Sequence, residues 1–162
     1  MNARLFEVNS AGRFPDVPFE VPARMESNLR AEHDLPVVLV VDDERVIADT
    51  LSMILEKNGF VALAAYDGIS ALEIATKVPP KLLISDVVMP NMSGIDLAIA
   101  IGHAVPDCKV ILFSGQASTA DLLAAARLAG HDFVTLTKPV HPTEMLARVS
   151  EGLGLRKEVP IT

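Results

Sequence analysis

The sequence predicts an α/β fold in which helices cover both faces of a five-stranded parallel sheet. Short runs rich in valine, leucine and isoleucine alternate with stretches in which apolar residues recur at helical spacing. Strands that alternate with helices in this way form parallel sheets with right-handed crossovers. The third run is continuously apolar, which is typical of a strand buried on both faces. The five strands are expected at 37–41, 60–65, 81–86, 109–113 and 133–136.

Capping residues predict where the helices begin. Ser93 with Asp96, and Ser118 with Asp121, match the capping box, in which two side chains satisfy backbone N–H groups at a helix start. Pro142 suits a first helical position, because no N–H donor is needed there. The apolar faces of the five expected helices fall within 47–55, 69–77, 95–105, 122–129 and 142–149.

Three regions are expected along the chain. Residues 1–34 contain several prolines and no sustained apolar period, so we interpret them as a flexible N-terminal arm. Their phenylalanines leave open a second interpretation, in which the arm docks on a surface. Residues 35–155 are expected to form the folded domain and 156–162 a C-terminal tail. Because few residues follow the last helix, a stand-alone domain without a separate output domain is expected.

Composition argues against several functional classes. The formal net charge of the 162 residues is -7, whereas a surface that binds nucleic acid needs a basic face. Cys108 is the sole cysteine, so no internal disulfide can form. The first residues lack the apolar core of a signal peptide, and no segment is long enough to cross a bilayer. A cytoplasmic protein that neither binds nucleic acid nor inserts into a membrane is expected.

Reactive side chains stand at the ends of four of the five expected strands. Asp42 and Asp43 follow the first strand, Asp86 ends the third, Ser114 follows the fourth and Lys138 follows the fifth. The carboxyl ends of parallel strands share one edge of the sheet, where such folds bind ligands. Crowded carboxylates repel one another unless a cation compensates, and both Mg²⁺ and a lysine can supply that charge. A carboxylate in such a site can attack phosphorus and form an aspartyl phosphate.

These motifs resemble those of the receiver domain of two-component response regulators, and their order and spacing match over residues 37–153. The resemblance implies the flavodoxin-like strand order 2-1-3-4-5 and a phospho-accepting signalling module. The matching residues are the Val-Val-Asp-Asp-Glu run at 40–44, Asp86 followed by Met89-Pro90 and Gly94, Ser114-Gly115, and Lys138-Pro139.

The resemblance implies a role for each acidic residue. Asp86 would receive a phosphoryl group from a phosphohistidine on a sensor histidine kinase or a histidine phosphotransfer protein. Asp43, Asp86 and the backbone carbonyl of Val88 would bind Mg²⁺ directly, and Asp42 would act through a bound water. The domain would not be an enzyme, but it would assist its own phosphorylation and dephosphorylation. Phosphorylation would change a surface that binds a downstream protein, and formation of a homodimer is left open.

The resemblance also assigns roles to residues at the last two strands. Lys138 would pair with Asp86 or with its phosphate, and the peptide bond from Lys138 to Pro139 would be cis. Ser114 would move toward the phosphate and act as a switch residue.

One region departs from the family pattern. The family usually carries an aromatic switch residue three positions before the lysine, where this chain has Thr135. Phe133 lies two residues earlier and would share the same strand face, so Thr135 or Phe133 is the candidate for the second switch residue. The segment 130–138 is also one residue longer than is usual. The relay from Ser114 to the last strand is the part of the family pattern that this change affects.

The sequence leaves one alternative function open and argues against two others. The unusual region around Thr135 motivates a receiver-like module that binds partners without switching. A phosphohydrolase of the haloacid dehalogenase type usually carries a second aspartate two residues after its nucleophile, where this chain has Val88, so that function is disfavoured. No glycine-rich phosphate loop follows any expected strand, which argues against nucleotide binding.

Overall fold

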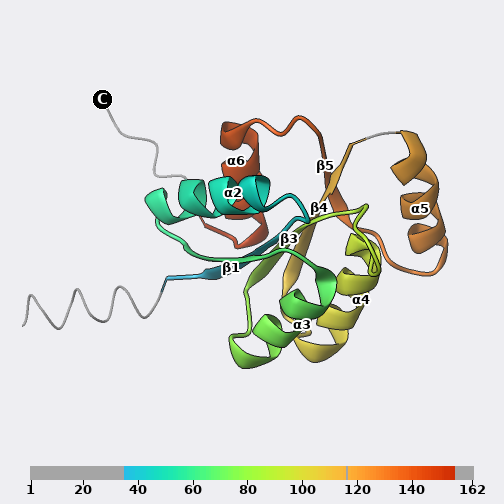
Figure 1. Cartoon of the computed structure of the whole chain (residues 1–162), viewed down its shortest axis with the longest axis horizontal. Coiled ribbons are helices and arrows are strands. Elements are labelled where there is room, and N and C mark those ends of the chain that lie inside the picture. The colour runs from blue at the N-terminus through green and yellow to red at the C-terminus, as the bar shows by residue number, and fades with distance from the viewer. Residues whose placement is uncertain (1–34, 116, 156–162) are drawn as a thin grey trace, which may run out of the picture. The chain divides into compact units, whose positions relative to one another are not determined.

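The computed structural model describes residues 35–115 and 117–155, which form a parallel sheet with helices on both faces (Figure 1). Each strand is parallel to its neighbours, and the strand order is β2-β1-β3-β4-β5. The predicted fold class and the order 2-1-3-4-5 are therefore confirmed. The strands are β1 (Val37–Val41), β2 (Val61–Ala65), β3 (Leu82–Asp86), β4 (Lys109–Ser114) and β5 (Val134–Thr137).

Helices cover the two faces of the sheet in two groups. One apolar core joins the sheet to the first and last helices, and a second core joins the opposite face to the three helices between them (Figure 1). Each crossover therefore places its helix on one face or the other, as expected for a doubly wound fold. In the part of the chain that the structure describes, the helices are α2 (Arg45–Lys57), α3 (Gly68–Lys77), α4 (Gly94–Ala104), α5 (Ala117–Leu128) and α6 (Pro142–Gly152).

Alternate residues of the central strands point into the two cores. In β1, Val38 packs in the same core as Leu55 of α2 and Met145 of α6, whereas Leu39 packs in the same core as Ile101 of α4. All of these side chains are fully buried. Because β1 and β3 are covered on both faces, neither strand needs a polar side, and both sequences are apolar until the carboxyl end.

Several of the predicted helix starts agree with the structure. Ser93 is the N-cap of α4 and forms the complete capping box with Asp96. Pro142 occupies the first turn of α6, whose N-cap is His141. The Nδ1 atom of His141 accepts a hydrogen bond from the backbone N–H of Thr143 at 3.4 Å. These local signals place the two helices correctly because each is satisfied within a single turn.

Three predicted details are wrong. Helix α5 begins at Ala117, so Ser118 lies inside the first turn and is not the N-cap; the short connection after β4 turns into the helix before Ser118 is reached. Leu122 was expected in the core but is 46% exposed, because α5 turns a different face inward. Strand β5 begins at Val134 instead of Phe133, because its pairing with β4 begins where Val134 lies opposite Ile111.

Some predictions fall outside the described residues. The arm at 1–34 and the tail at 156–162 belong to this group, so the domain boundaries stay predictions. Among the helices that the structure describes, none is both long and apolar enough to cross a membrane.

Candidate functional site

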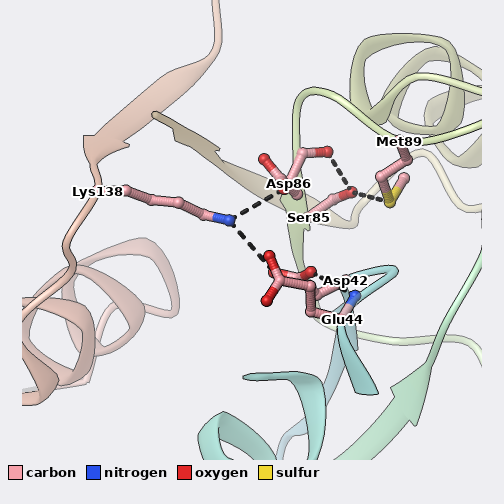
Figure 2. Close-up of polar contacts among 6 residues, drawn as sticks. All are labelled: Asp42, Glu44, Ser85, Asp86, Met89 and Lys138. Carbon is pink, nitrogen blue, oxygen red and sulfur yellow. Dashed lines mark hydrogen bonds and ion pairs between the residues drawn. The ribbon is translucent and has the colours of Figure 1, made fainter. Parts of the chain in front are cut away.

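The carboxyl ends of three strands bring the charged residues of the site together. Asp42 and Asp43 directly follow β1, Asp86 is the last residue of β3, and Lys138 directly follows β5. Figure 2 shows the side chains of Asp42, Asp86 and Lys138 pointing toward one another. The site lies at the edge of the sheet where ligands bind in folds of this kind.

Lys138 bridges two carboxylates that come from different strands. Its Nζ atom lies 3.0 Å from Oδ2 of Asp86 and 3.4 Å from Oδ2 of Asp42 (Figure 2). Burial by itself lowers the pKa of Lys138, but the hydrogen bond to Asp86 and the charges of Asp42 and Asp86 outweigh that effect and raise the pKa. The ammonium group therefore stays charged at neutral pH.

Asp42 is the most deeply buried of the three acids. Only 2% of its side chain is exposed, and its Oδ1 atom accepts a hydrogen bond from the backbone N–H of Glu44 at 2.9 Å. Burial raises the pKa of Asp42, and the N–H of Glu44 and the charge of Lys138 only partly oppose this effect. The ionised form of Asp42 therefore depends on positive charge beside it.

The three acids form a site that suits a divalent cation. Asp42, Asp43 and Asp86 each offer one carboxylate oxygen, and these oxygens lie within 4.8 Å of one another. Asp43 is exposed and Asp86 is half-buried, so the cluster can be reached from solvent. Hard oxygen donors in a partly hydrated setting are the ligands that Mg²⁺ prefers, so these residues fit the predicted ion. The role predicted for the carbonyl of Val88 stays a prediction.

Asp43, Asp86 and Lys138 line a cavity of about 340 Å³. Val88 stands at this cavity with 56% of its surface exposed. Sequence reasoning assigned no role to Glu44, Gly115 or Thr119. Glu44 adjoins the acid pair, and this neighbourhood could have identified it, whereas the Ser118 and Asp121 pattern around Thr119 indicates a helix start and not a site. The cavity is lined by Asp43, Glu44, Asp86, Val88, Gly115, Thr119 and Lys138.

The loop after β3 holds Asp86 in place. The Oγ atom of Ser85 donates a hydrogen bond to the backbone oxygen of Asp86 at 3.0 Å and lies 4.0 Å from Sδ of Met89 (Figure 2). The N–H of Gly94 donates to the carbonyl of Val87 at 2.8 Å. A Cβ atom on Gly94 would collide with the backbone oxygen of Asp86, so only glycine permits this approach. The turn is therefore folded tightly against the reactive strand end.

Ser114 lies at the end of β4, where its backbone is fixed by the neighbouring strand. Its carbonyl oxygen accepts a hydrogen bond from the N–H of Lys138 at 2.9 Å, and Ser114 pairs with Thr137 in the sheet. The peptide bond from Lys138 to Pro139 is cis, as expected. Ser114 does not belong to the residues that line the cavity. Its role as a switch stays a prediction that requires its side chain to move.

The two candidates for the second switch residue lie in different environments. Thr135 is exposed in β5, opposite Leu112 of β4. Phe133 precedes the strand, is half-buried, and stacks on His131 with ring centroids 6.0 Å apart. Neither side chain lines the cavity at Asp86. Their switching role stays a prediction.

Comparisons with known proteins agree with this geometry. The family model of the response regulator receiver domain matches residues 38–150. The probable transcriptional regulatory protein TcrX of Mycobacterium tuberculosis is 35% identical over 120 residues, which are 74% of this chain and 50% of that protein. The chain therefore spans about half the length of this curated relative.

Solved structures of receiver proteins resemble the chain as well. The crystal structure of a response regulator receiver domain protein from Clostridium thermocellum has a TM-score of 0.67 and 29% identity, over 74% of this chain and 95% of that one. A CheY-like receiver domain protein from Methanospirillum hungatei has a TM-score of 0.68 and 27% identity, over 75% and 95% respectively.

Proposed function

This chain belongs to the family of response regulator receiver domains, and we propose that its Asp86 accepts a phosphoryl group from a phosphohistidine of a partner protein. The observation that carries the proposal is the contact of one ammonium group with two carboxylates beside an open cavity. Such an arrangement balances the charge of Asp86 and leaves space for a tetrahedral group. The partner is a sensor histidine kinase or a histidine phosphotransfer protein.

The transfer forms one bond and breaks one. A carboxylate oxygen of Asp86 bonds to phosphorus while the bond from phosphorus to the imidazole nitrogen breaks. The electron pair of the broken bond stays on the imidazole, which leaves as a neutral ring because its other nitrogen carries a proton. Lys138, which is 3.0 Å from Asp86, stabilises the negative charge on a phosphoryl oxygen.

The acid cluster would hold Mg²⁺ during this step. We propose that Asp43, Asp86 and the carbonyl of Val88 bind the ion directly, and that Asp42 acts through water. Bound Mg²⁺ would neutralise charge on the phosphoryl oxygens. The close spacing of the three acids supports this assignment. The same residues would support the later attack of water on phosphorus, so the domain would assist its own dephosphorylation.

The domain phosphorylated at Asp86 would act by changing a surface that binds another protein. Apolar side chains are exposed on α5 and β5, namely Leu122, Leu128 and Val134, and exposed apolar groups favour protein contacts. We propose that this region binds a downstream protein in the cytoplasm. A homodimer is the alternative use of the same region.

Small-molecule phosphorylation tests the proposal directly. The full chain is incubated with Mg²⁺ and acetyl phosphate, and the mass of the intact protein is measured. We expect one phosphoryl group on the wild type and none on Asp86→Asn. Asp107→Asn is a matched control, because Asp107 is exposed near the opposite end of the sheet. An unlabelled wild type, or labelling of Asp86→Asn equal to that of wild type, would refute the proposal.

A module that binds without switching is the second candidate. It is favoured by Thr135, an exposed residue with no aromatic ring at a position where the family usually carries one. This candidate predicts that the same amount of partner protein is captured by the wild type, by its beryllofluoride complex, which mimics the phosphorylated state, and by Asp86→Asn. A difference in capture between the beryllofluoride complex and the other two forms would exclude it.

A further inference from the structure

A hydroxyl group other than that of Ser114 lines the cavity at Asp86. Thr119, in the first turn of α5, shares this cavity with Asp86 and Lys138, and only 3% of its surface is exposed. Four polar or charged residues are buried in the described part of the chain: Asp42, Ser52, Ser85 and Thr119. Three of these four, namely Asp42, Ser85 and Thr119, lie at the site. Thr119 therefore places a buried hydroxyl group in the wall of the cavity that it shares with Asp86 and Lys138.

Thr119 also belongs to the narrow face by which α5 packs. Among the described side chains of α5, only Thr119, Leu123 and Ala126 are buried or half-buried, at the spacing i, i+4 and i+7. Leu123 and Ala126 join the core shared with α3 and α4. Leu128, by contrast, is 91% exposed. A hydrogen bond to a charged group is comparable in strength to the burial of one such apolar side chain, so it can shift the packing of this helix.

The two hydroxyl groups near the site are attached to different parts of the domain. Ser114 belongs to β4, and its backbone is held by pairing with β5. A contact made by Ser114 therefore acts on the sheet. A contact made by Thr119 acts on α5, the helix that carries the exposed Leu122 and Leu128.

We propose that the hydroxyl group of Thr119 donates a hydrogen bond to a phosphoryl oxygen on Asp86 and thereby tightens the packing of α5. A threonine hydroxyl can reorient about its bond to Cβ and donate to an anionic oxygen. The inference rests on the proposed function, because it needs a phosphoryl group or a tetrahedral mimic at Asp86. The inference adds one residue that contacts the phosphoryl group. It also gives a route by which phosphorylation of Asp86 changes the packing of α5.

Beryllofluoride is the probe, because it binds as a tetrahedral anion at an aspartate in the presence of Mg²⁺. Its affinity is measured by calorimetry on the full chain, and hydrogen exchange of the α5 amides is measured with and without it. Thr119→Val removes the hydroxyl group at nearly constant volume, and Thr119→Ser retains it. Thr76→Val is the control, because Thr76 is exposed on α3 away from the cavity.

We expect beryllofluoride to slow exchange in α5 of the wild type, of Thr119→Ser and of Thr76→Val. Thr119→Val should bind it about tenfold more weakly, as the loss of one hydrogen bond to a charged group implies, and should show no slowing in α5. Equal affinity and equal slowing in Thr119→Val would overturn the inference.

Two further outcomes separate the possible failures. If the wild type binds beryllofluoride but exchange in α5 does not change, the inference about Thr119 is wrong, whatever the stability of the variants. If the wild type neither binds beryllofluoride nor accepts a phosphoryl group, the proposed function itself fails.

Discussion

The ammonium group of Lys138 lies 3.0 Å from a carboxylate oxygen of Asp86, although 52 residues separate the two in the chain. The same ammonium group also contacts Asp42. Lys138 therefore already supplies one positive charge to the acid cluster. A bound divalent cation would add its own charge to that of Lys138. Two cations that neutralise the same carboxylates compete with each other.

Replacing Lys138 by methionine should strengthen Mg²⁺ binding and weaken phosphorylation. Loss of one nearby ammonium charge should lower the dissociation constant for Mg²⁺ by about tenfold. The rate of labelling by acetyl phosphate should fall by at least about tenfold, because a phosphoryl oxygen loses its partner. Calorimetry and intact-mass kinetics measure these effects. Lys109→Met, at an exposed lysine near the other end of the sheet, is the control, and weaker Mg²⁺ binding by Lys138→Met would contradict the argument.

Asp42→Asn should stabilise the metal-free domain at neutral pH. The pKa of Asp42 is raised by folding, so its favourable contribution is complete below its ordinary value of 3.8 and is lost as the pH rises through the folded value. Asparagine retains an acceptor for the N–H of Glu44 and carries no charge. We expect the free energy of unfolding to rise by about 1 kcal/mol at pH 7, with Tm higher by roughly 2–5 °C. Urea titrations should show this gain shrinking as the pH falls toward 3.8, and a gain that is independent of pH would contradict it.

Mg²⁺ should stabilise the wild type by mass action. At a concentration 100 times the dissociation constant, the gain is about 2.7 kcal/mol and appears as a rise in Tm. Asp43→Ala should lose most of this rise while keeping the Tm of the metal-free domain, because Asp43 is exposed. Asp107→Ala should respond like the wild type. An undiminished response in Asp43→Ala would remove Asp43 from the metal site.

Two glycines of α4 should respond in opposite ways to alanine. Gly94→Ala places a Cβ atom against the backbone oxygen of Asp86 and should lower the free energy of unfolding by about 3 kcal/mol or more. Gly102→Ala meets no atom within 4 Å, lies inside the helix, and should raise the free energy of unfolding by roughly 0.5–1 kcal/mol. Chemical denaturation distinguishes the two. A neutral Gly94→Ala would show that the turn after β3 relaxes easily.

The thiol of Cys108 should react slowly with alkylating agents. Burial raises the pKa of Cys108 from 9.0 to about 11, so at pH 8 its thiolate fraction is roughly 100-fold below that of an unperturbed thiol. Iodoacetamide should therefore modify the folded chain much more slowly than it modifies the chain unfolded in urea. The rate for the folded chain should keep rising up to about pH 11. Equal rates for the folded and unfolded chain would contradict the burial of this thiol.

The parts of the site that could be predicted from the sequence are those attached to strand ends. Asp42, Asp86 and Lys138 each adjoin a buried strand, and a parallel sheet brings such positions together whatever the details of helix packing. Thr119 could not be predicted in this way. Its place at the cavity depends on which face α5 turns inward, and an alanine-rich helix with leucines on several sides does not specify that face.

The last strand shows a second limit of local patterns. Phe133 favours a strand by composition, but the start of β5 is decided by its pairing with β4, which begins with Val134 opposite Ile111. Phe133 stacks on His131 instead. The prediction for Ser118 failed for a similar reason, since a capping pattern does not fix how soon the chain turns after a strand.

The sparse anchoring of α5 has a consequence for how such a domain can diversify. Because, among the described side chains of α5, Leu123 and Ala126 are those that reach the apolar core, substitutions on the outer side of the helix are nearly neutral for folding. Under the proposed function, recognition of a new partner can then be acquired one surface residue at a time while the proposed phosphoryl transfer to Asp86 stays intact. The outer side of α5 is therefore the place at which to redesign the specificity of this domain.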